Sequence, residues 1–462
     1  MANFTLDGKI CIERELNIIP VESEIDNLNT RFDIEQTCKW INKNQFKKVC
    51  LQFPDELLGI STNVYEEIKK QTNVDLYILG DTSYASCCVD IVAAMHVESD
   101  AIVHYGHSCF SKTELPTYLV HHKTSLDINE VMSTISLSLV SNTDVSSEKL
   151  CLFYDAEYEH IKEPLSKSWF QQYPQSYMAI IDCMEPKPNQ YLGRIIKNKS
   201  NQEFPIDVLN DCFCIFIGSR GQTFFNYTIS VPSKQWYLLD PASNMFDVIE
   251  ETVWFKRRRY LIEKCKDANV IGILMCTLAG DQTKDIISRM KQLCKANGKK
   301  SYIVSVGKPN VAKLANFPEI DIYVMIACPE NSLYDERNFY KPLVYPFELE
   351  VALNSNREPY PALHVIDYNE LLPGKKHHCD ISEVFEGTDV SLITGKIRET
   401  KVSSQGTCKD LIEKENWELE SIGHNLQNRS WKGLEQKLGE SDVKIAEGGR
   451  KGIPIQYNDE PN

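Results

Sequence analysis

A repeated pattern of short apolar runs and amphipathic segments most constrains the fold of this 462-residue chain. Residues 47–105 predict the order β-α-β-α-β, and residues 270–326 repeat it. The predicted strands of the two copies are 47–53, 76–80, 101–105, 270–275, 301–305 and 322–326. Long crossover segments favour parallel strand pairing. The two copies therefore predict two α/β units with parallel sheets.

The stretch between the two copies predicts a third, less regular set of strands. These are expected at 150–154, 177–181, 212–217 and 236–239, interrupted by the polar segment 186–203. We therefore expect an α/β fold of three related, parallel-sheet (Rossmann-like) domains followed by a polar C-terminal extension. The predicted boundaries are 1–135, 136–262 and 263–368 for the domains, and 369–462 for a partly disordered extension. Residues 363–368 are expected to add an edge strand.

Charge and hydropathy exclude several classes of function. The net charge of −15 repels phosphate backbones, so a nucleic-acid partner is not expected. The strongest apolar stretch, 270–279, is about half of the ~20 residues that a membrane-spanning helix needs. Neither end carries a secretion or lipidation signal, so we expect a soluble, cytoplasmic protein with no membrane partner.

The chain contains 16 cysteines, which a reducing compartment would keep from forming a disulfide framework. The cysteines that lie within apolar, strand-like runs are expected to be small core residues. This group comprises Cys50, Cys151, Cys212, Cys214 and Cys276.

Three other cysteines are candidate metal ligands: Cys88, Cys109 and Cys328. Cys109 and Cys328 each follow the third predicted strand of a copy, and Cys88 follows the second strand of the first copy. Loops at the carboxyl ends of parallel strands meet at one crevice, and three thiolates there suit an iron–sulfur cluster. The alternative is that these are packed loop thiols. The neighbour Cys87 would point about 100° away from Cys88 in a helix, so only one of the two is expected to bind.

Three other motifs are explained by structure rather than by a catalytic or binding role. The turn Gly218–Thr223 has features of a phosphate-binding loop but lacks the lysine that follows in such loops, so it favours a tight turn. His104 is expected on a strand with a satisfied hydrogen bond rather than as a base. The basic run 256–259 is expected on a solvated helix face.

Four longer motifs stand out: Leu51-Gln52-Phe53-Pro54-Asp55, Leu79-Gly80-Asp81-Thr82-Ser83-Tyr84 with Cys87-Cys88-Val89-Asp90, His104-Tyr105-Gly106-His107-Ser108-Cys109, and Arg429-Ser430-Trp431-Lys432-Gly433-Leu434. Together they resemble the motifs of the diphthamide-biosynthesis radical enzyme family. The resemblance implies three related α/β units around a 4Fe-4S cluster, in a heterodimer of two homologous subunits. It places the cluster ligands of this chain at Cys88, Cys109 and Cys328.

The resemblance also implies an activity for the complex. In the family, the cluster of the catalytic subunit cleaves S-adenosylmethionine, and the 3-amino-3-carboxypropyl group is transferred to a histidine of elongation factor 2. The homologous catalytic subunit is expected to bind S-adenosylmethionine, and an electron-donor protein is expected to supply electrons. The expected alternative is a cluster-free scaffold that stabilises the partner and presents elongation factor 2.

One stretch departs from the family pattern. The catalytic subunit takes one ligand from a Leu-Gly-Cys stretch of its middle domain, where this chain has Leu192-Gly193-Arg194. A guanidinium has no lone pair to give to iron. The resemblance therefore implies an altered cluster site that supports the partner subunit, by electron relay or by keeping the partner's cluster assembled.

Overall fold

The computed structural model describes most of the chain between residues 28 and 399, and four residues near its end. The described residues are 28–80, 86–111, 113–141, 148–182, 187, 189–249, 253–276, 282–306, 309–328, 330, 339–381, 388–399, 452–453 and 456–457. The chain divides into two compact units, Met1–Val402 and Ser403–Asn462. In the second unit, the described residues form an antiparallel pair, β18 (Gly452–Ile453) and β19 (Gln456–Tyr457). The motif at 429–434 and most of the predicted extension lie outside the described residues.

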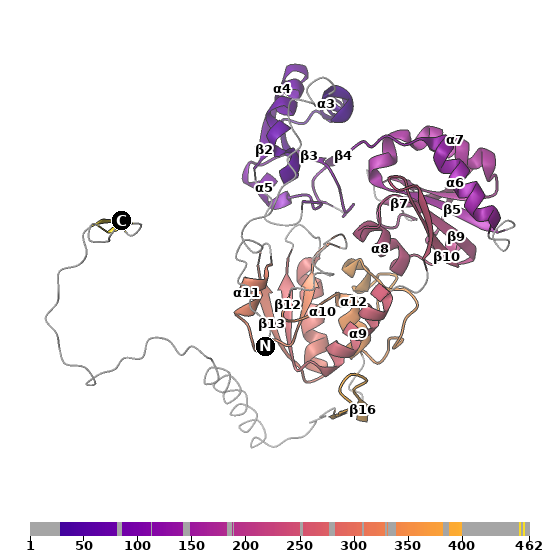
Figure 1. The fold of residues 1–462 in the computed structure, drawn as a ribbon. Helices are drawn as coiled ribbons and strands as arrows, with labels where there is room; N and C mark the ends of the chain where they lie inside the picture. The colour runs from indigo at the N-terminus through magenta and orange to yellow at the C-terminus, as the bar shows by residue number, and fades with distance from the viewer. Residues whose placement is uncertain are drawn as a thin grey trace. The chain divides into compact units, whose positions relative to one another are not determined.

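The first sheet has four parallel strands in the order β2-β1-β3-β4. Figure 1 shows β2, β3 and β4 of this sheet beside α4 and α5. The predicted β-α-β-α-β order is confirmed here, and β4 extends it by one strand. Strands β1 and β3 are buried almost throughout, as parallel strands covered on both faces should be. The elements are α2 (Leu28–Arg31), α3 (Ile34–Asn44), β1 (Lys48–Gln52), η3 (Asp55–Ile60), α4 (Ser61–Gln71), β2 (Asp75–Leu79), α5 (Ile91–His96), β3 (Ala101–Tyr105) and β4 (Thr117–Val120).

The second sheet has seven strands in the order β11-β10-β9-β5-β6-β7-β8. Its centre is parallel, but β11, β7 and β8 pair antiparallel at the two edges. The loops before β11 and β8 are too short for a parallel crossover, so these segments return as hairpins. The elements are α6 (Ile128–Ser141), β5 (Lys149–Tyr154), η4 (Ala156–Ile161), α7 (Lys162–Gln172), β6 (Tyr177–Ile181), β7 (Arg194–Asn198), β8 (Glu203–Phe204), η5 (Ile206–Asp211), β9 (Cys212–Ile217), α8 (Gln222–Ser230), β10 (Gln235–Asp240) and β11 (Met245–Ile249).

The third sheet has four parallel strands in the order β13-β12-β14-β15, the same order as the first sheet. The two predicted copies therefore share one topology. Gly272 in β12 allows the close approach of β14, because a Cβ there would lie 2.6 Å from the Tyr323 ring. The elements are α9 (Val253–Asp267), β12 (Val270–Met275), α10 (Thr283–Ala296), β13 (Lys300–Ser305), α11 (Val311–Ala315), β14 (Ile322–Ile326), β15 (Leu343–Val344), α12 (Pro346–Leu353), η7 (Tyr368–Leu371) and the hairpin of β16 (Thr388–Val390) and β17 (Ile397–Glu399).

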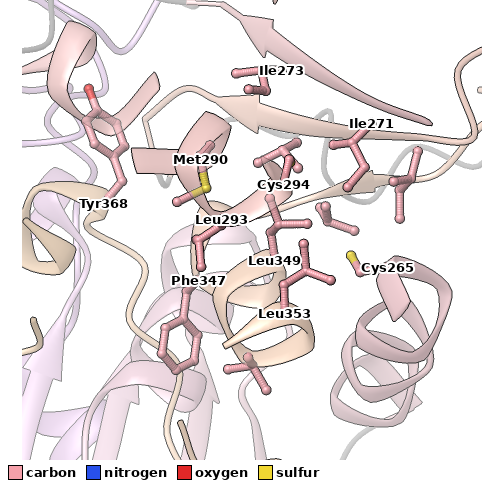
Figure 2. Close-up of a cluster of buried hydrophobic side chains, with 14 of the residues drawn as sticks. Cys265, Ile271, Ile273, Met290, Leu293, Cys294, Phe347, Leu349, Leu353 and Tyr368 are labelled. Atoms are coloured by element: carbon pink, nitrogen blue, oxygen red, sulfur yellow. The ribbon is translucent and has the colours of Figure 1, made fainter. Parts of the chain in front are cut away.

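The core of the third sheet is formed by side chains of α9, α10 and α12 against β12 (Figure 2). Cys265 and Cys294 belong to this core, and burial raises the pKa of both thiols. The five cysteines predicted as core residues are also confirmed as buried, with at most 3% exposure. Among the described residues, no helix is both long and apolar enough to cross a bilayer. The predicted domain boundaries remain a prediction.

Two local expectations were wrong. Residues 363–368 form no strand; instead the backbone N–H of His364 donates to the Ile229 carbonyl oxygen over 2.8 Å. Arg258, in the basic run of α9, is not solvated but fully buried. Its guanidinium binds both carboxylate oxygens of Glu348 at 2.5 and 2.6 Å, and both side chains are 0% exposed. Lys256 in the same run is exposed as expected, so the expectation of a solvated face was wrong for Arg258, which instead forms a buried pair between α9 and α12.

Replacing Glu348 with glutamine removes the negative charge of the carboxylate that accepts two hydrogen bonds from the buried Arg258 guanidinium. We expect Glu348→Gln to lower the free energy of unfolding by roughly 3–5 kcal/mol, as for other broken buried ion pairs. Urea denaturation followed by circular dichroism measures this change. The control is Glu35→Gln, which breaks the exposed pair with Lys39 and should leave the unfolding curve unchanged. Equal effects of the two substitutions would contradict the assignment.

His364 predicts a pH dependence of stability. It is 4% exposed, its ring centroid lies 5.5 Å from those of Phe255 and Phe347, and neither ring nitrogen has a hydrogen-bond partner among the residues that the structure describes. Burial, followed by the charges of Arg258 and Arg259, lowers its pKa to about 3. Because the unfolded histidine has a pKa of about 6.5, only the unfolded chain gains a proton as pH falls, so stability is lost over that window.

His364→Phe should remove this proton uptake. Between about pH 6 and 4, the unfolding free energy of the variant should fall less steeply, by about 1.4 kcal/mol per pH unit. Urea denaturation at several pH values tests this, with the exposed His160→Phe as the control. Parallel pH profiles for the wild-type chain and His364→Phe would show that this imidazole does not titrate as described.

Candidate metal centre

Four cysteine thiols converge at one buried point in the protein. The Sγ atoms of Cys87, Cys88, Cys109 and Cys328 all lie within 4.8 Å of one another, and each residue is at most 9% exposed. The three candidates from the sequence therefore meet, and Cys87 joins them. A group of soft thiol ligands of this kind is typical of a metal or iron–sulfur centre.

The topology of two sheets brings these thiols together. Cys109 follows β3, and Cys328 follows β14, which holds the same place in the third sheet. Cys87 and Cys88 lie in the turn after β2. All four thus come from the carboxyl ends of parallel strands, where ligands collect in open α/β sheets.

Both members of the Cys87–Cys88 pair face the centre, which the sequence did not predict. The expectation of one ligand assumed a helix, but residues 86–88 form a turn. The Sγ atom of Cys87 lies 3.4 Å from that of Cys328 and 4.0 Å from that of Cys88, which in turn lies 3.9 Å from that of Cys109. The structure therefore does not select Cys88 over Cys87.

Side chains of the first sheet hold this turn in place. Gln52, at the end of β1, donates to the Cys88 carbonyl oxygen over 2.7 Å and accepts from the Asp90 backbone N–H over 2.9 Å. The Nε2 atom of His104 in β3 lies 3.0 Å from the Ser86 carbonyl oxygen, as expected for a histidine with a structural hydrogen bond. Gln52 was missed as a site residue, although a glutamine in an apolar strand was a usable signal.

The four thiols differ in the direction in which their pKa values shift. The Cys109 thiol has a pKa well below its usual value, because Cys328 first, and then Cys87 and Cys88, hydrogen-bond to its sulfur. The same interaction raises the pKa of Cys328, with burial adding to the effect. A metal that binds here as a thiolate complex must displace the protons that these thiols carry.

Glu330, two residues after Cys328, connects three segments around the centre. Its carboxylate accepts hydrogen bonds from Thr223 Oγ1 at 2.8 Å and Asn226 Nδ2 at 3.2 Å, both in α8, and lies 3.4 Å from His107 Nε2. Although burial opposes protonation, the Glu330 carboxylate raises the pKa of His107. The start of α8, which includes the last two residues of the Gly218–Thr223 stretch, therefore binds a carboxylate of the same chain. No sequence signal marked this role of Glu330.

The Leu192–Arg194 stretch reaches the centre but brings no thiol to it. Gly193 has a φ of +74°, and a Cβ there would lie 2.5 Å from the Cβ of Phe110, the residue after Cys109. Arg194 is 2% exposed and donates to Tyr227 Oη at 2.7 Å and to the carbonyl oxygens of Ala179 and Tyr154 at 3.1 and 2.5 Å. Its guanidinium is therefore bound within the second sheet and its helices.

Comparisons with known proteins agree on one family. The family model described as "Putative diphthamide synthesis protein" matches residues 53–361. A 2-(3-amino-3-carboxypropyl)histidine synthase subunit 2 from Danio rerio is 37% identical, over 93% of this chain and 92% of its own length. The protein of that name from Gallus gallus is 34% identical, over 99% of this chain and 98% of its own.

A solved structure shares the fold. It is the crystal structure of Dph2 from Pyrococcus horikoshii with a 4Fe-4S cluster, which matches with a TM-score of 0.55 and 22% sequence identity. The match covers 75% of this chain and 95% of the Pyrococcus horikoshii chain. The predicted α/β fold with several parallel-strand sheets is confirmed.

Gln52 offers a test of how the turn is positioned. Gln52→Leu removes both hydrogen bonds to the Cys88 turn, so we expect the full chain to bind Co²⁺ about 10–100-fold more weakly. Anaerobic titration followed by absorption measures this affinity. The control is Gln235→Leu, which removes one side-chain hydrogen bond to a carbonyl oxygen in the second sheet. Equal Co²⁺ affinities for the two variants would contradict the role of Gln52.

Proposed function

The chain belongs to the diphthamide synthesis protein family, and from this premise we propose that it is the non-autonomous iron–sulfur subunit of the transferase complex. The complex transfers a 3-amino-3-carboxypropyl group from S-adenosylmethionine to a histidine of elongation factor 2, the first step of diphthamide synthesis. The names of the relatives and their coverage of nearly the whole chain support this proposal.

The single observation that carries the proposal is the convergence of buried thiols from two sheets. Cys88, Cys109 and Cys328 are the ligands that we assign, and their Sγ atoms belong to the group that lies within 4.8 Å. Thiolates are the ligands that iron–sulfur clusters require, so the donor set fits a 4Fe-4S cluster. The cluster named for the Pyrococcus horikoshii structure supports the same assignment.

The residues around the thiols prepare the site for electron transfer. When bound, a 4Fe-4S cluster supplies one-electron chemistry. Gln52 and His104 fix the turn that carries Cys88, and the low exposure of the cysteines keeps water from the ligands. Arg194 provides no thiol from the second sheet, so the ligand set differs from that of a three-domain catalytic site. The chain would then relay electrons to the partner or maintain the partner's cluster.

The proposed partners follow from this division of work. A homologous catalytic subunit binds S-adenosylmethionine and forms a heterodimer with this chain, which is inactive alone. Elongation factor 2 is the protein substrate, and an electron-donor protein supplies electrons in the cytoplasm. We also propose the domain boundaries 1–135, 136–262 and 263–368, with an extension at 369–462.

Anaerobic co-expression with the catalytic homologue tests the proposal. The wild-type chain should bind about four iron atoms of its own, and the Cys88/Cys109/Cys328→Ala variant should lose them. Transfer to elongation factor 2 should then fall, although the partner's cluster remains. Iron and sulfide analysis together with the transfer assay measure both effects.

The matched control is Cys50/Cys151/Cys294→Ala, which removes three buried thiols outside the group. This variant should keep its iron even if the new cavities lower its stability. A wild-type chain that lacks iron in a fully active complex would instead support the cluster-free scaffold.

A further inference from the structure

We propose that the centre is a four-thiolate site in which Cys87 and Cys88 both bind the metal, so that no metal position stays open to a substrate. For the iron–sulfur form, the inference rests on the proposed function. The four-thiolate site itself rests only on the structure.

Cys87 is as close to its neighbouring sulfur atoms, and as buried, as the other three cysteines. Of the three sulfur–sulfur distances given above, the shortest is the 3.4 Å between Cys87 and Cys328. The side chain of Cys87 is 6% exposed, less than the 8% of Cys88. The Cys87 carbonyl oxygen accepts from the Cys109 N–H over 3.2 Å, and that of Cys88 accepts from Gln52. Both carbonyl oxygens therefore accept hydrogen bonds from groups other than thiols, while both side chains point toward the other cysteine sulfurs.

The spacing of the sulfurs agrees with tetrahedral coordination. Four thiolates around one ion with metal–sulfur bonds of about 2.3 Å have their sulfur atoms about 3.8 Å apart. The three sulfur–sulfur distances, 3.4, 3.9 and 4.0 Å, lie close to this value. A single tetrahedral ion is therefore a suitable probe for the number of thiolates.

Among the described residues, no histidine or carboxylate competes for the fourth position, and the hydroxyl of Ser111, 3.1 Å from Cys109 Sγ, is a harder and weaker ligand than a thiolate. The group of metal-ligand atoms contains only the four cysteines, without a histidine or a carboxylate. The nearby His107 faces the Glu330 carboxylate, and His104 faces the Ser86 carbonyl oxygen. The fourth ligand is therefore Cys87 rather than a neighbouring imidazole.

Four thiolates have a consequence for function. A 4Fe-4S cluster with one thiolate on each iron has no iron free to bind the sulfonium substrate. It can still accept one electron and pass it on, because that step makes and breaks no bond. The inference thus deepens the proposed function: the chain contributes electrons, while substrate binding belongs to the partner subunit.

Co²⁺ bound to the full chain after anaerobic removal of iron tests the number of thiolates. The wild-type chain should bind one Co²⁺ with the intense visible bands of a tetrahedral tetrathiolate. In both Cys87→Ala and Cys88→Ala, the sulfur-to-cobalt charge-transfer intensity should fall by about a quarter, since one of four thiolates is lost. Cys50→Ala removes a buried thiol outside the group and should leave the spectrum unchanged.

A spectrum that changes in only one of the two variants would overturn the proposal, because the other cysteine of the Cys87–Cys88 pair would then not bind the metal. That result would leave the proposed function intact, since three thiolates still bind a cluster. A second measurement uses the iron-loaded chain: the electron paramagnetic resonance signal of the reduced cluster should not change when S-adenosylmethionine is added. A change in that signal for the wild-type chain would show an open iron and would also overturn the proposal.

Discussion

The meeting of cysteine side chains from two separate sheets is the constraint on which the rest of the site depends. Each sheet closes its own apolar core and ends its strands at one edge, and the thiols lie on the loops beyond that edge. The loops after β3 and β14 occupy equivalent places in two sheets of the same strand order. Ligands far apart in the sequence therefore meet without any single element that carries them all.

A set of polar side chains holds these loops in place, because the cysteines alone cannot. Gln52 and His104 fasten the turn of Cys87 and Cys88 to the first sheet, and Glu330 links the Cys328 loop to α8. These contacts bury polar groups that would be costly to leave unpaired. Their geometry stabilises the loop conformations in which the thiols face one another, so a metal meets a prepared site.

The sequence predicted the features that depend on the periodicity of apolar residues. It did not predict the features that depend on contacts between residues far apart in the chain. Alternating apolar runs predicted the order of strands and helices in both copies, and apolar neighbours predicted the buried cysteines such as Cys50. β7 (Arg194–Asn198) was missed because it lies within the polar segment 186–203, and β11 was missed because a hairpin return depends on loop length as well as on strand pattern. The burial of Arg258 depends on Glu348, ninety residues away, and is invisible to local charge patterning. Likewise, the turn at Cys87 and Cys88 depends on Gln52 rather than on their own residue types.

The placement of Arg194 shows how the edge of the second sheet can hold a large charged side chain. Its guanidinium is accommodated by Tyr227 and by carbonyl oxygens of neighbouring strands, while Gly193 lies against Phe110. Under the proposed correspondence with the Leu-Gly-Cys stretch of the catalytic subunit, a single codon change after gene duplication exchanges a ligand for an inert residue without loss of the fold. Two paralogous proteins of one architecture would in this way divide labour between them.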